Sequence, residues 1–331
     1  MRALIVTALL AGCTDYEIYV HDGTDVFYQN PVSEVDILLV VDDSCSMQPY
    51  QQQLSQNFSE FISFFIDAQV DYHIGVTTTD VMSDGAGHII GEIITPETAD
   101  GSGVFADNVN VGVEGSGSEM GLEAARLALS EPRISSTNAG FLRDTASLSV
   151  VFVSDEEDSS PWPVNRYINT FMDIKGARER DIFNASSLVV LDPQTCAPAA
   201  QAGSTRGDRY LDVTTHTGGV SGDICADTFA DMITELSLNA SRLRDTFFLS
   251  SEPAPATIEV SVDEALIPCD AGEWTFTRVD DNGTDRPAVV FERVFMPAPS
   301  SQIAIRYDYG SGDPTGFCEG GSAGDDTGGA R

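Results

Sequence analysis

The sequence has very little positive charge. Among its 331 residues, 17 are Lys or Arg and 52 are Asp or Glu, which gives a formal net charge of −35, and Lys175 is the only lysine. A protein that binds nucleic acid needs clustered Lys and Arg to displace counterions from the phosphates. The composition therefore argues against binding to nucleic acid and to anionic membrane surfaces. Cations and cationic partners are compatible with this charge, as is a role in solubility alone.

The common signatures of enzymes are also missing. The sequence contains no Gly-x-Ser-x-Gly nucleophile elbow and no phosphate-binding loop that ends in Gly-Lys-Ser/Thr. Its 4 histidines form no spaced His/Cys cluster of the kind that zinc needs. Cys45 has no identifiable base for nucleophilic chemistry. We therefore expect that the protein is not an enzyme.

Long hydrophobic runs are absent too, since none approaches the ~18 residues that a membrane-spanning helix requires. The first 12 residues instead follow the pattern of a signal peptide, with Arg2 before a short apolar stretch and Leu-Ala-Gly before Cys13. Leu-Ala-Gly-Cys resembles the lipobox of bacterial lipoproteins, which implies cleavage before Cys13 and a lipid on Cys13 as the one membrane attachment. By resemblance to many lipoproteins, Thr14 rather than Asp at the next position favours the outer membrane of the bacterial cell envelope, on its periplasmic or surface face. The alternative is a plain signal peptide followed by an ordinary cysteine.

The central part of the chain has the pattern of an α/β domain. Two nearly continuous apolar runs, Val35–Val41 and Leu148–Val153, are typical of strands buried on both faces, as in parallel sheets. Between them, apolar residues at helical spacing predict an amphipathic helix over residues 49–68. Strand and helix patterns alternate as far as residue 248. This alternation predicts a doubly wound, mostly parallel sheet flanked by helices.

From residue 253 the pattern changes to short alternating strands, which predict a small antiparallel β module. We divide the chain into five segments: a signal peptide (1–12), a lipid anchor and linker (13–34), the α/β domain (35–250), the β module (251–318) and a disordered, acidic, Gly-rich tail (319–331).

The cysteine count fits an exported protein, in which disulfides can form. We predict the pairs Cys196–Cys225 and Cys269–Cys318, because the second pair brackets the C-terminal segment. This pairing leaves Cys45 free, although spacing alone does not fix the connectivity.

Polar side chains follow both buried strands at the points where they end. Asp42, Ser44 and Ser46 come at alternating positions after the first strand, and Asp155 follows the second. In doubly wound sheets, ligands bind outside the carboxyl ends of the strands. Carboxylate and hydroxyl oxygens suit Mg²⁺, Ca²⁺ or Mn²⁺ better than zinc. The sequence therefore predicts a divalent-cation site at this edge of the sheet.

The order of these residues resembles the von Willebrand factor type A (vWA) family. The Asp-x-Ser-x-Ser of Asp42, Ser44 and Ser46, which follows an apolar strand, is similar to that family's metal-ion-dependent adhesion site (MIDAS), and Asp155 is similar to its later aspartate. The lipobox at the N-terminus further resembles vWA-type lipoproteins of bacteria. The resemblance implies a vWA-like, Rossmann-like fold.

Other parts of the resemblance are looser. The family's intervening threonine falls on Ser116, with Ser118 as the alternative, and Cys45 stands where the family usually has a small residue. Thr-Gly-Gly at 217–219, after residues 210–213, is similar to the family's last strand region. The resemblance implies that the hydroxyls of Ser44, Ser46 and Ser116 bind Mg²⁺ or Ca²⁺ directly and that the two aspartates act largely through water. An Asp or Glu carboxylate from a partner protein would then complete the coordination.

The resemblance thus implies a membrane-anchored, cation-dependent protein-binding module for adhesion or envelope complex assembly, and the high charge favours a monomer. Two alternatives stay open. One is a structural envelope lipoprotein whose vWA domain no longer binds metal, in which Ser44 or Ser46 caps a helix and Ser116 forms a capping box with Glu119. The other is a metal-assisted hydrolase with Glu156 as a base beside the metal site.

Overall fold

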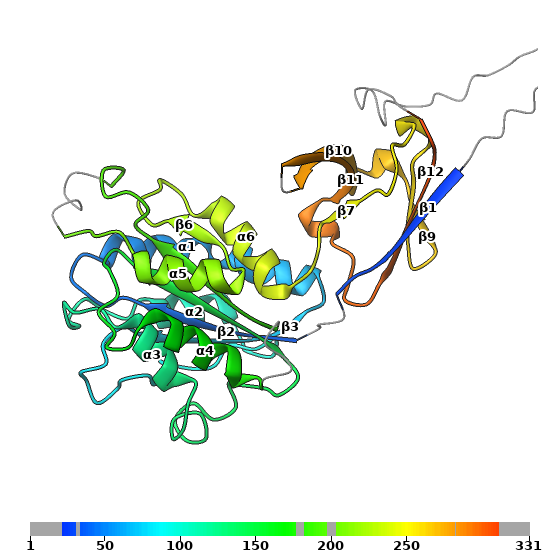
Figure 1. The fold of residues 1–331 in the computed structure, drawn as a ribbon. Helices are drawn as coiled ribbons and strands as arrows, with labels where there is room; N and C mark the ends of the chain where they lie inside the picture. Colours follow the sequence, from blue (N-terminus) through cyan, green and yellow to red (C-terminus); the bar gives the residue numbers. More distant parts are fainter. Residues whose placement is uncertain (1–21, 31–33, 177–181, 197–202, 282, 311–331) are drawn as a thin grey trace, which may run out of the picture.

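The computed structural model describes residues 22–30, 34–176, 182–196, 203–281 and 283–310, which form two joined bodies (Figure 1). The predicted signal peptide, Cys13, Cys318 and the tail at 319–331 lie outside these residues and stay predictions. Within the described ranges, no helix is both long enough and apolar enough to cross a membrane.

The larger body is built on a five-stranded sheet with the strand order β3-β2-β4-β5-β6. All neighbouring strands in it are parallel. Nearly every residue of β2 and β4 is buried, because helices cover both faces of the sheet. The predicted α/β fold class is confirmed. The strands run over Glu34–Val41 (β2), Asp71–Thr78 (β3), Ser147–Ser154 (β4), Phe183–Val189 (β5) and Ser221–Asp223 (β6).

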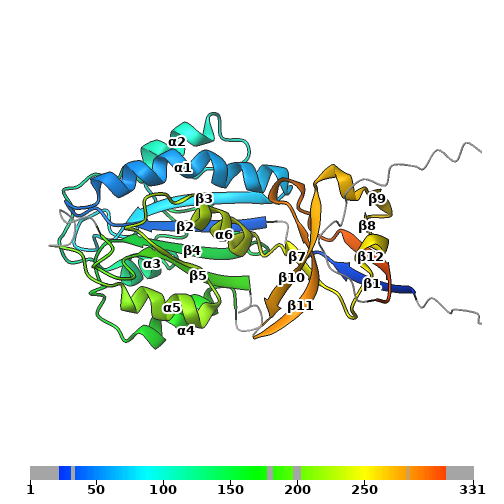
Figure 2. The same cartoon turned by 90° about the horizontal axis from the view of Figure 1, so that it is seen from above.

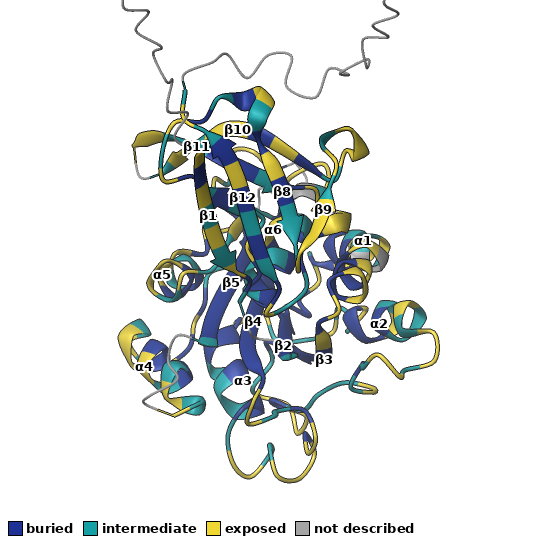
Figure 3. Cartoon of the chain, turned by 90° about the vertical axis from the view of Figure 1, so that its right-hand side faces the viewer, coloured by how far each residue is buried: buried dark blue, intermediate teal, exposed yellow. Residues whose placement is uncertain are grey.

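The side chains of β2 alternate between two cores, one on each face of the sheet. Ile37 and Leu39 belong to one core, and Leu38 and Val40 belong to the other. Figure 2 shows β3, β2, β4 and β5 side by side, and Figure 3 shows how the helices divide between the two faces. On the first face lie α1 (Gln48–Asp67), α2 (Gly101–Val109) and α6 (Ala230–Ser241), and on the second lie α3 (Gly121–Ala128), α4 (Val164–Ile174) and α5 (Asp208–Thr217).

The helices of the structure differ from the sequence predictions at three places. Residues 210–213, which the sequence associated with a strand region, lie inside α5. Tyr210 and Val213 are both buried there, because residues three apart lie on the same face of a helix. The helices α2 and α4 were not predicted.

The smaller body is a sandwich of two antiparallel sheets around a core that includes Val260, Trp274 and Ile305. One sheet has the order β1-β12-β8-β9 and the other has the order β10-β11-β7. Figure 3 views the molecule from this end, where buried and exposed residues alternate along the start of β10. The strands run over Asp22–Tyr28 (β1), Thr246–Phe248 (β7), Glu259–Val262 (β8), Ala265–Ile267 (β9), Trp274–Asp281 (β10), Thr284–Phe291 (β11) and Gln302–Asp308 (β12).

Strand β1 corrects the predicted division of the chain, because residues 22–28 were assigned to a linker. They pair instead with the whole of β12, from Asp22 with Asp308 to Tyr28 with Gln302. The C-terminal β module is therefore completed by the N-terminal strand, and the α/β body is inserted into the chain between β1 and β7. The predicted boundary at residue 250 also lies too late, because β7 pairs with β11 of the sandwich.

Specific contacts fix β1 to the rest of the sandwich. The Asp25 carboxylate accepts hydrogen bonds from the Tyr307 hydroxyl and from the Ser250 backbone N–H, both at 2.8 Å. The ring of Phe27 lies 5.3 Å from that of Phe247. Since Phe27 packs against the sandwich core, β1 contributes to that core as well as to its sheet.

We expect a chain that begins at residue 34 to have a much less stable sandwich than one that begins at residue 22. The shorter chain lacks the partly buried Phe27 and leaves one edge of β12 without a partner, while β12 keeps its pairing with β8. Loss of a fully buried Phe costs about 3–5 kcal/mol, which is the upper bound for Phe27. Thermal unfolding and limited proteolysis of the two chains would measure the difference. Equal melting temperatures and equal protease resistance in residues 246–310 would contradict a structural role for β1.

Candidate functional site

The predicted site residues lie at the carboxyl edge of the parallel sheet. β2 and β4 are neighbours in register, with Val41 opposite Val153, so the residues that follow them come together. Asp42 directly follows β2, Asp155 directly follows β4, and both side chains are fully buried. Ser44 is buried as well.

A chain of hydrogen bonds joins four of the five predicted residues. The two Asp42 carboxylate oxygens accept hydrogen bonds from the Ser44 backbone N–H at 2.7 Å and from the Ser154 hydroxyl at 2.6 Å. The hydroxyl oxygens of Ser44 and Ser46 lie 3.2 Å apart. The Ser46 hydroxyl donates to Asp155 Oδ1 at 3.0 Å. The sequence order therefore brings Asp42, Ser44, Ser46 and Asp155 into one cluster.

Ser116, the fifth residue, is not part of this hydrogen-bond chain. Its hydroxyl accepts a hydrogen bond from the Ser118 backbone N–H at 3.1 Å. The alternative of a capping box with Glu119 is also wrong, because α3 begins at Gly121 and no side chain caps it at Met120.

Glu119, which the sequence pattern placed in a helix cap, is buried near Asp42 and is a further candidate for this site. Its side chain is buried with 1% exposure, and its Oε2 accepts a hydrogen bond from the Thr79 hydroxyl. Its Oε1 is buried without a hydrogen-bond partner. Burial, followed by the nearby Asp42 charge, raises the pKa of Glu119 to about 9. The only sequence signal for this role was an acid shortly before a helix, which is also typical of a cap.

The three buried carboxylates, Asp42, Glu119 and Asp155, have no basic partner among the residues that the structure describes. Burial, together with the neighbouring Asp42 charge, raises the pKa of Asp155 as well. Buried negative charges without compensation are costly. The cluster therefore needs either protons or a bound cation.

The backbone of the neighbouring loop is held against the end of β2. The Gly115 N–H donates to the Asp43 carbonyl oxygen at 2.9 Å, and a Cβ at Gly115 would lie 2.2 Å from Asp43 Oδ1. A side chain at this position would displace the Asp43 carboxylate. Burial, followed by the Asp80 charge, raises the pKa of Asp43 to about 6.

Helix α1 also holds the loops at this edge. The Gln51 amide donates to the carbonyl oxygens of Asp42 and Gly112 at 3.0 and 2.9 Å.

The acidic string after β4 contains a structural residue. Asp158 is buried and pairs with the Arg209 guanidinium at 2.8 Å. It also accepts hydrogen bonds from the Ser160 hydroxyl and from the Leu122 backbone N–H in the first turn of α3. By contrast, Glu156 is half-buried, and burial and the charges of Asp42 and Asp155 raise its pKa.

The donor set of the cluster fits a hard divalent cation. Carboxylate and hydroxyl oxygens are the ligands that Mg²⁺ and Ca²⁺ prefer, and Glu119 Oε1 is a buried oxygen without a partner. Across the described ranges, no group of three or more His, Cys, Asp or Glu side chains is placed to hold a metal ion. Any cation here would therefore depend on the serine hydroxyls in addition to carboxylates.

The cysteines near this edge of the sheet are arranged as predicted where the structure describes them. Cys196 and Cys225 form a disulfide that joins the segments following β5 and β6. Cys45 is free and exposed within the loop that carries Ser44 and Ser46. Cys269 is also disulfide-bonded, and its predicted partner, Cys318, lies outside the described residues.

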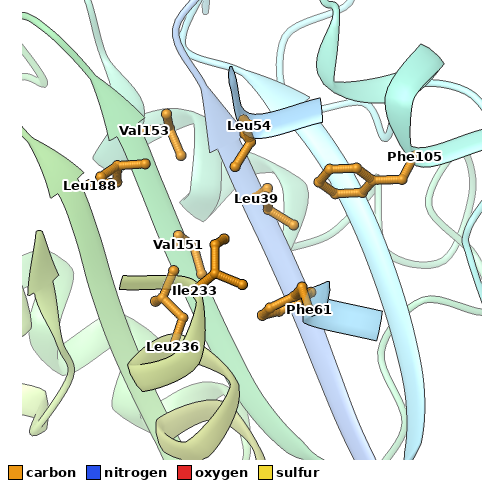
Figure 4. Close-up of a pocket in the computed structure, with 9 residues that line it drawn as sticks. All are labelled: Leu39, Leu54, Phe61, Phe105, Val151, Val153, Leu188, Ile233 and Leu236. Atoms are coloured by element: carbon orange, nitrogen blue, oxygen red, sulfur yellow. The ribbon is translucent and has the colours of Figure 1, made fainter. Parts of the chain in front are cut away.

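A small cavity of about 20 Å³ lies elsewhere, between the sheet and the helices α1, α2 and α6 (Figure 4). Its lining is entirely apolar, so it offers no group that could orient a polar or ionic ligand. We therefore assign the chemistry to the carboxyl edge of the sheet. The lining residues are Leu39, Leu54, Phe61, Phe105, Val151, Val153, Leu188, Ile233 and Leu236.

The chain is similar to several solved structures in its three-dimensional fold. No protein-family model matches the chain, and no curated protein matches its sequence. The similar solved structures include a von Willebrand factor type A structure from Catenulispora acidiphila, which is 13% identical with a TM-score of 0.39, over 89% of this chain and 66% of that one.

Two further similar structures are those of a pilus adhesin and of a byssal matrix protein. The pilus adhesin SpaC from Lactobacillus rhamnosus GG is 11% identical, with a TM-score of 0.48, over 86% of this chain and 41% of that one. Proximal thread matrix protein 1 from the mussel byssus, with a zinc-occupied MIDAS motif, is 13% identical, with a TM-score of 0.37, over 67% of this chain and 51% of that one. The chain thus spans less than two thirds of the length of each of these three proteins.

Proposed function

We propose that the chain is a cation-dependent protein-binding module of the vWA type, anchored to the bacterial envelope through a lipid on Cys13. Its site is the cluster of Asp42, Ser44, Ser46 and Asp155, and its cation is Mg²⁺ or Ca²⁺, with Mn²⁺ as a further candidate. Its partner is a protein that supplies an Asp or Glu carboxylate. The outer membrane and a monomeric state belong to the same proposal.

One observation carries the cation assignment. Asp42, Asp155 and Glu119 are almost fully buried near one another, and none of them has an ion-pair partner among the described residues. A dication would compensate their charge, and the hydroxyls beside them would add ligands without further negative charge.

Each residue of the cluster would have its own role in binding the cation. Ser44 and Ser46 present hydroxyl oxygens 3.2 Å apart. Asp42 is held in place by the Ser154 hydroxyl, and Asp155 is held by the Ser46 hydroxyl. A bound dication would supply positive charge and an open coordination position for the partner's carboxylate. Burial of that carboxylate at the centre of an interface could provide a binding hot spot.

Titration calorimetry with Mg²⁺ and with Ca²⁺ tests this assignment. We expect Asp42→Asn to weaken binding of the preferred cation by about 100-fold, at the upper end of what loss of one supporting group costs a metal site. Asp212→Asn, a change to an exposed acid on α5, is the matched control and should bind as the unmodified chain does. Equal affinity of the Asp42→Asn and unmodified chains would refute the site.

Two other functions predict different results. A structural envelope lipoprotein without metal would capture its partner equally well with and without EDTA and in the Asp42→Asn variant. A hydrolase with Glu156 as base would turn over peptide, ester or phosphate substrates and lose this activity in Glu156→Gln. Capture from an envelope extract that requires the divalent cation and Asp42 would support the binding module over both.

A further inference from the structure

The two ends of the described chain lie together at one pole of the molecule. β1 begins at Asp22 and β12 ends at Asp308, and these two residues are opposite each other in the sheet. Both lie at the outer end of the sandwich, on the side away from the α/β body (Figure 1). Cys13 precedes β1 by only 9 residues, so the proposed lipid on Cys13 would be tethered to this pole.

The candidate cation site lies at the opposite pole. β1 runs from the outer end of the sandwich towards the α/β body, and β2 starts beside the sandwich and continues away from it (Figure 1). At about 3.3 Å per residue, the 7 residues of β1 and the 8 residues of β2 together span roughly 50 Å. Asp42 follows at the far end of this path.

The junction between the two bodies is held by reciprocal hydrogen bonds. The Gln29 side chain is buried, donates to the Arg244 carbonyl oxygen at 2.9 Å and accepts from the Arg244 N–H at 3.0 Å. The Asn30 side chain donates to the Arg242 carbonyl oxygen at 3.2 Å. Met296, which lies between β11 and β12 of the sandwich, packs into the core of the α/β body. These contacts tie the two connections together and limit bending between the bodies.

We propose that the sandwich is a spacer that holds the cation site away from the anchoring membrane. In this position the site would bind a carboxylate-bearing protein that is not in the same membrane. This inference rests on the proposed anchor and cation site. A partner in the plane of the same membrane would meet the sandwich instead of the site. The occupant of the site is therefore a protein on an opposing surface or free in the space beyond the membrane.

The free Cys45 allows a direct test, because it lies in the site loop and is exposed. The lipidated full chain, labelled with a fluorophore at Cys45, would be placed in phosphatidylcholine vesicles that contain a membrane-confined quencher. Thr24→Cys in a Cys45→Ser background places the same fluorophore on the exposed face of β1 and is the matched control.

We expect strong quenching of the fluorophore at Thr24→Cys and almost none at Cys45. Equal quenching at both positions, or stronger quenching at Cys45, would overturn the proposed orientation. Quenching reports position and needs no cation, so this result is separate from the calorimetric test of the site. Loss of cation binding with the expected quenching pattern would refute the site alone. Failure of the chain to stay on the vesicles without detergent would refute the anchor and, with it, this inference.

Discussion

In EDTA, the folded chain is expected to lose stability as the pH rises from about 4.5 towards about 9. The pKa of Glu119 rises from 4.5 to about 9 in the folded chain, because the side chain is buried beside Asp42. Over this range the folded state holds a proton that the unfolded state has released, so stability falls as pH increases. Each tenfold change in the acid constant is worth about 1.4 kcal/mol, so the total loss amounts to several kcal/mol.

Mg²⁺ or Ca²⁺ should restore much of this stability at the alkaline end. A bound dication would replace the proton as the compensating charge, and a ligand that binds only the folded state stabilises it by mass action. Urea unfolding at about pH 5 and about pH 8, with EDTA and with each cation, measures both effects. A stability that does not respond to cations at alkaline pH would favour the structural alternative, in which the cluster is neutralised by protons alone.

Glu119→Gln should flatten the pH dependence in EDTA. Glutamine keeps an oxygen that can accept the hydrogen bond from the Thr79 hydroxyl, but it has no charge to bury. Glu114→Gln, a change to an exposed acid on the preceding loop, is the matched control and should keep the steep dependence. Asp43, with its pKa raised to about 6, would leave a smaller slope in the same direction. Asp155 and Glu156, whose pKa values are also raised, would add to that slope. An unchanged slope in Glu119→Gln would show that this carboxylate is ionised in the folded chain.

The second large effect is expected at Asp36, near the amino end of β2. Its carboxylate is fully buried and accepts hydrogen bonds from the Arg143 backbone N–H at 2.7 Å and from its Nε at 2.8 Å. The Lys175 ammonium, whose side chain is 2% exposed, lies 3.5 Å from it. Burial lowers the pKa of Lys175, and the Asp36 charge opposes this shift. The only lysine of the chain is thus part of a buried ionic cluster.

We expect Asp36→Ala to destabilise the chain by about 3–5 kcal/mol, because it removes the buried counter-charge of Lys175 and leaves Arg143 with only the half-exposed Asp71. Asp71→Ala is the control: its side chain also pairs with Arg143 but is 50% exposed, so it should cost less than about 1 kcal/mol. Urea unfolding of the two variants measures the difference. Similar losses in both variants would mean that burial adds nothing to the importance of this pair.

The features that the sequence predicted well are those carried by short continuous segments. The apolar runs of β2 and β4 require burial on both faces, and that requirement determines a parallel sheet covered by helices. Once these strands are neighbours, Asp42 and Asp155 must follow them at the same edge. The serines of the loop then join them through hydrogen bonds that span only a few residues or this one pairing.

The features that only the tertiary structure decided depend on long-range pairing and on burial. β1 is the edge strand of its sheet, and few of its residues are buried. Its sequence therefore has no apolar run that would predict a strand. Its place in the fold depends on pairing with β12, which comes near the other end of the chain. Glu119 resembles an ordinary acid before a helix, and only the approach of its loop to Asp42 buries it. The sequence by itself thus determined the sheet and the placement of four predicted site residues at one edge of it, because local periodicity and strand ends are local properties. The insertion of one body into the other, the uncompensated charge of the site and its distance from the chain ends were decided by contacts between distant segments.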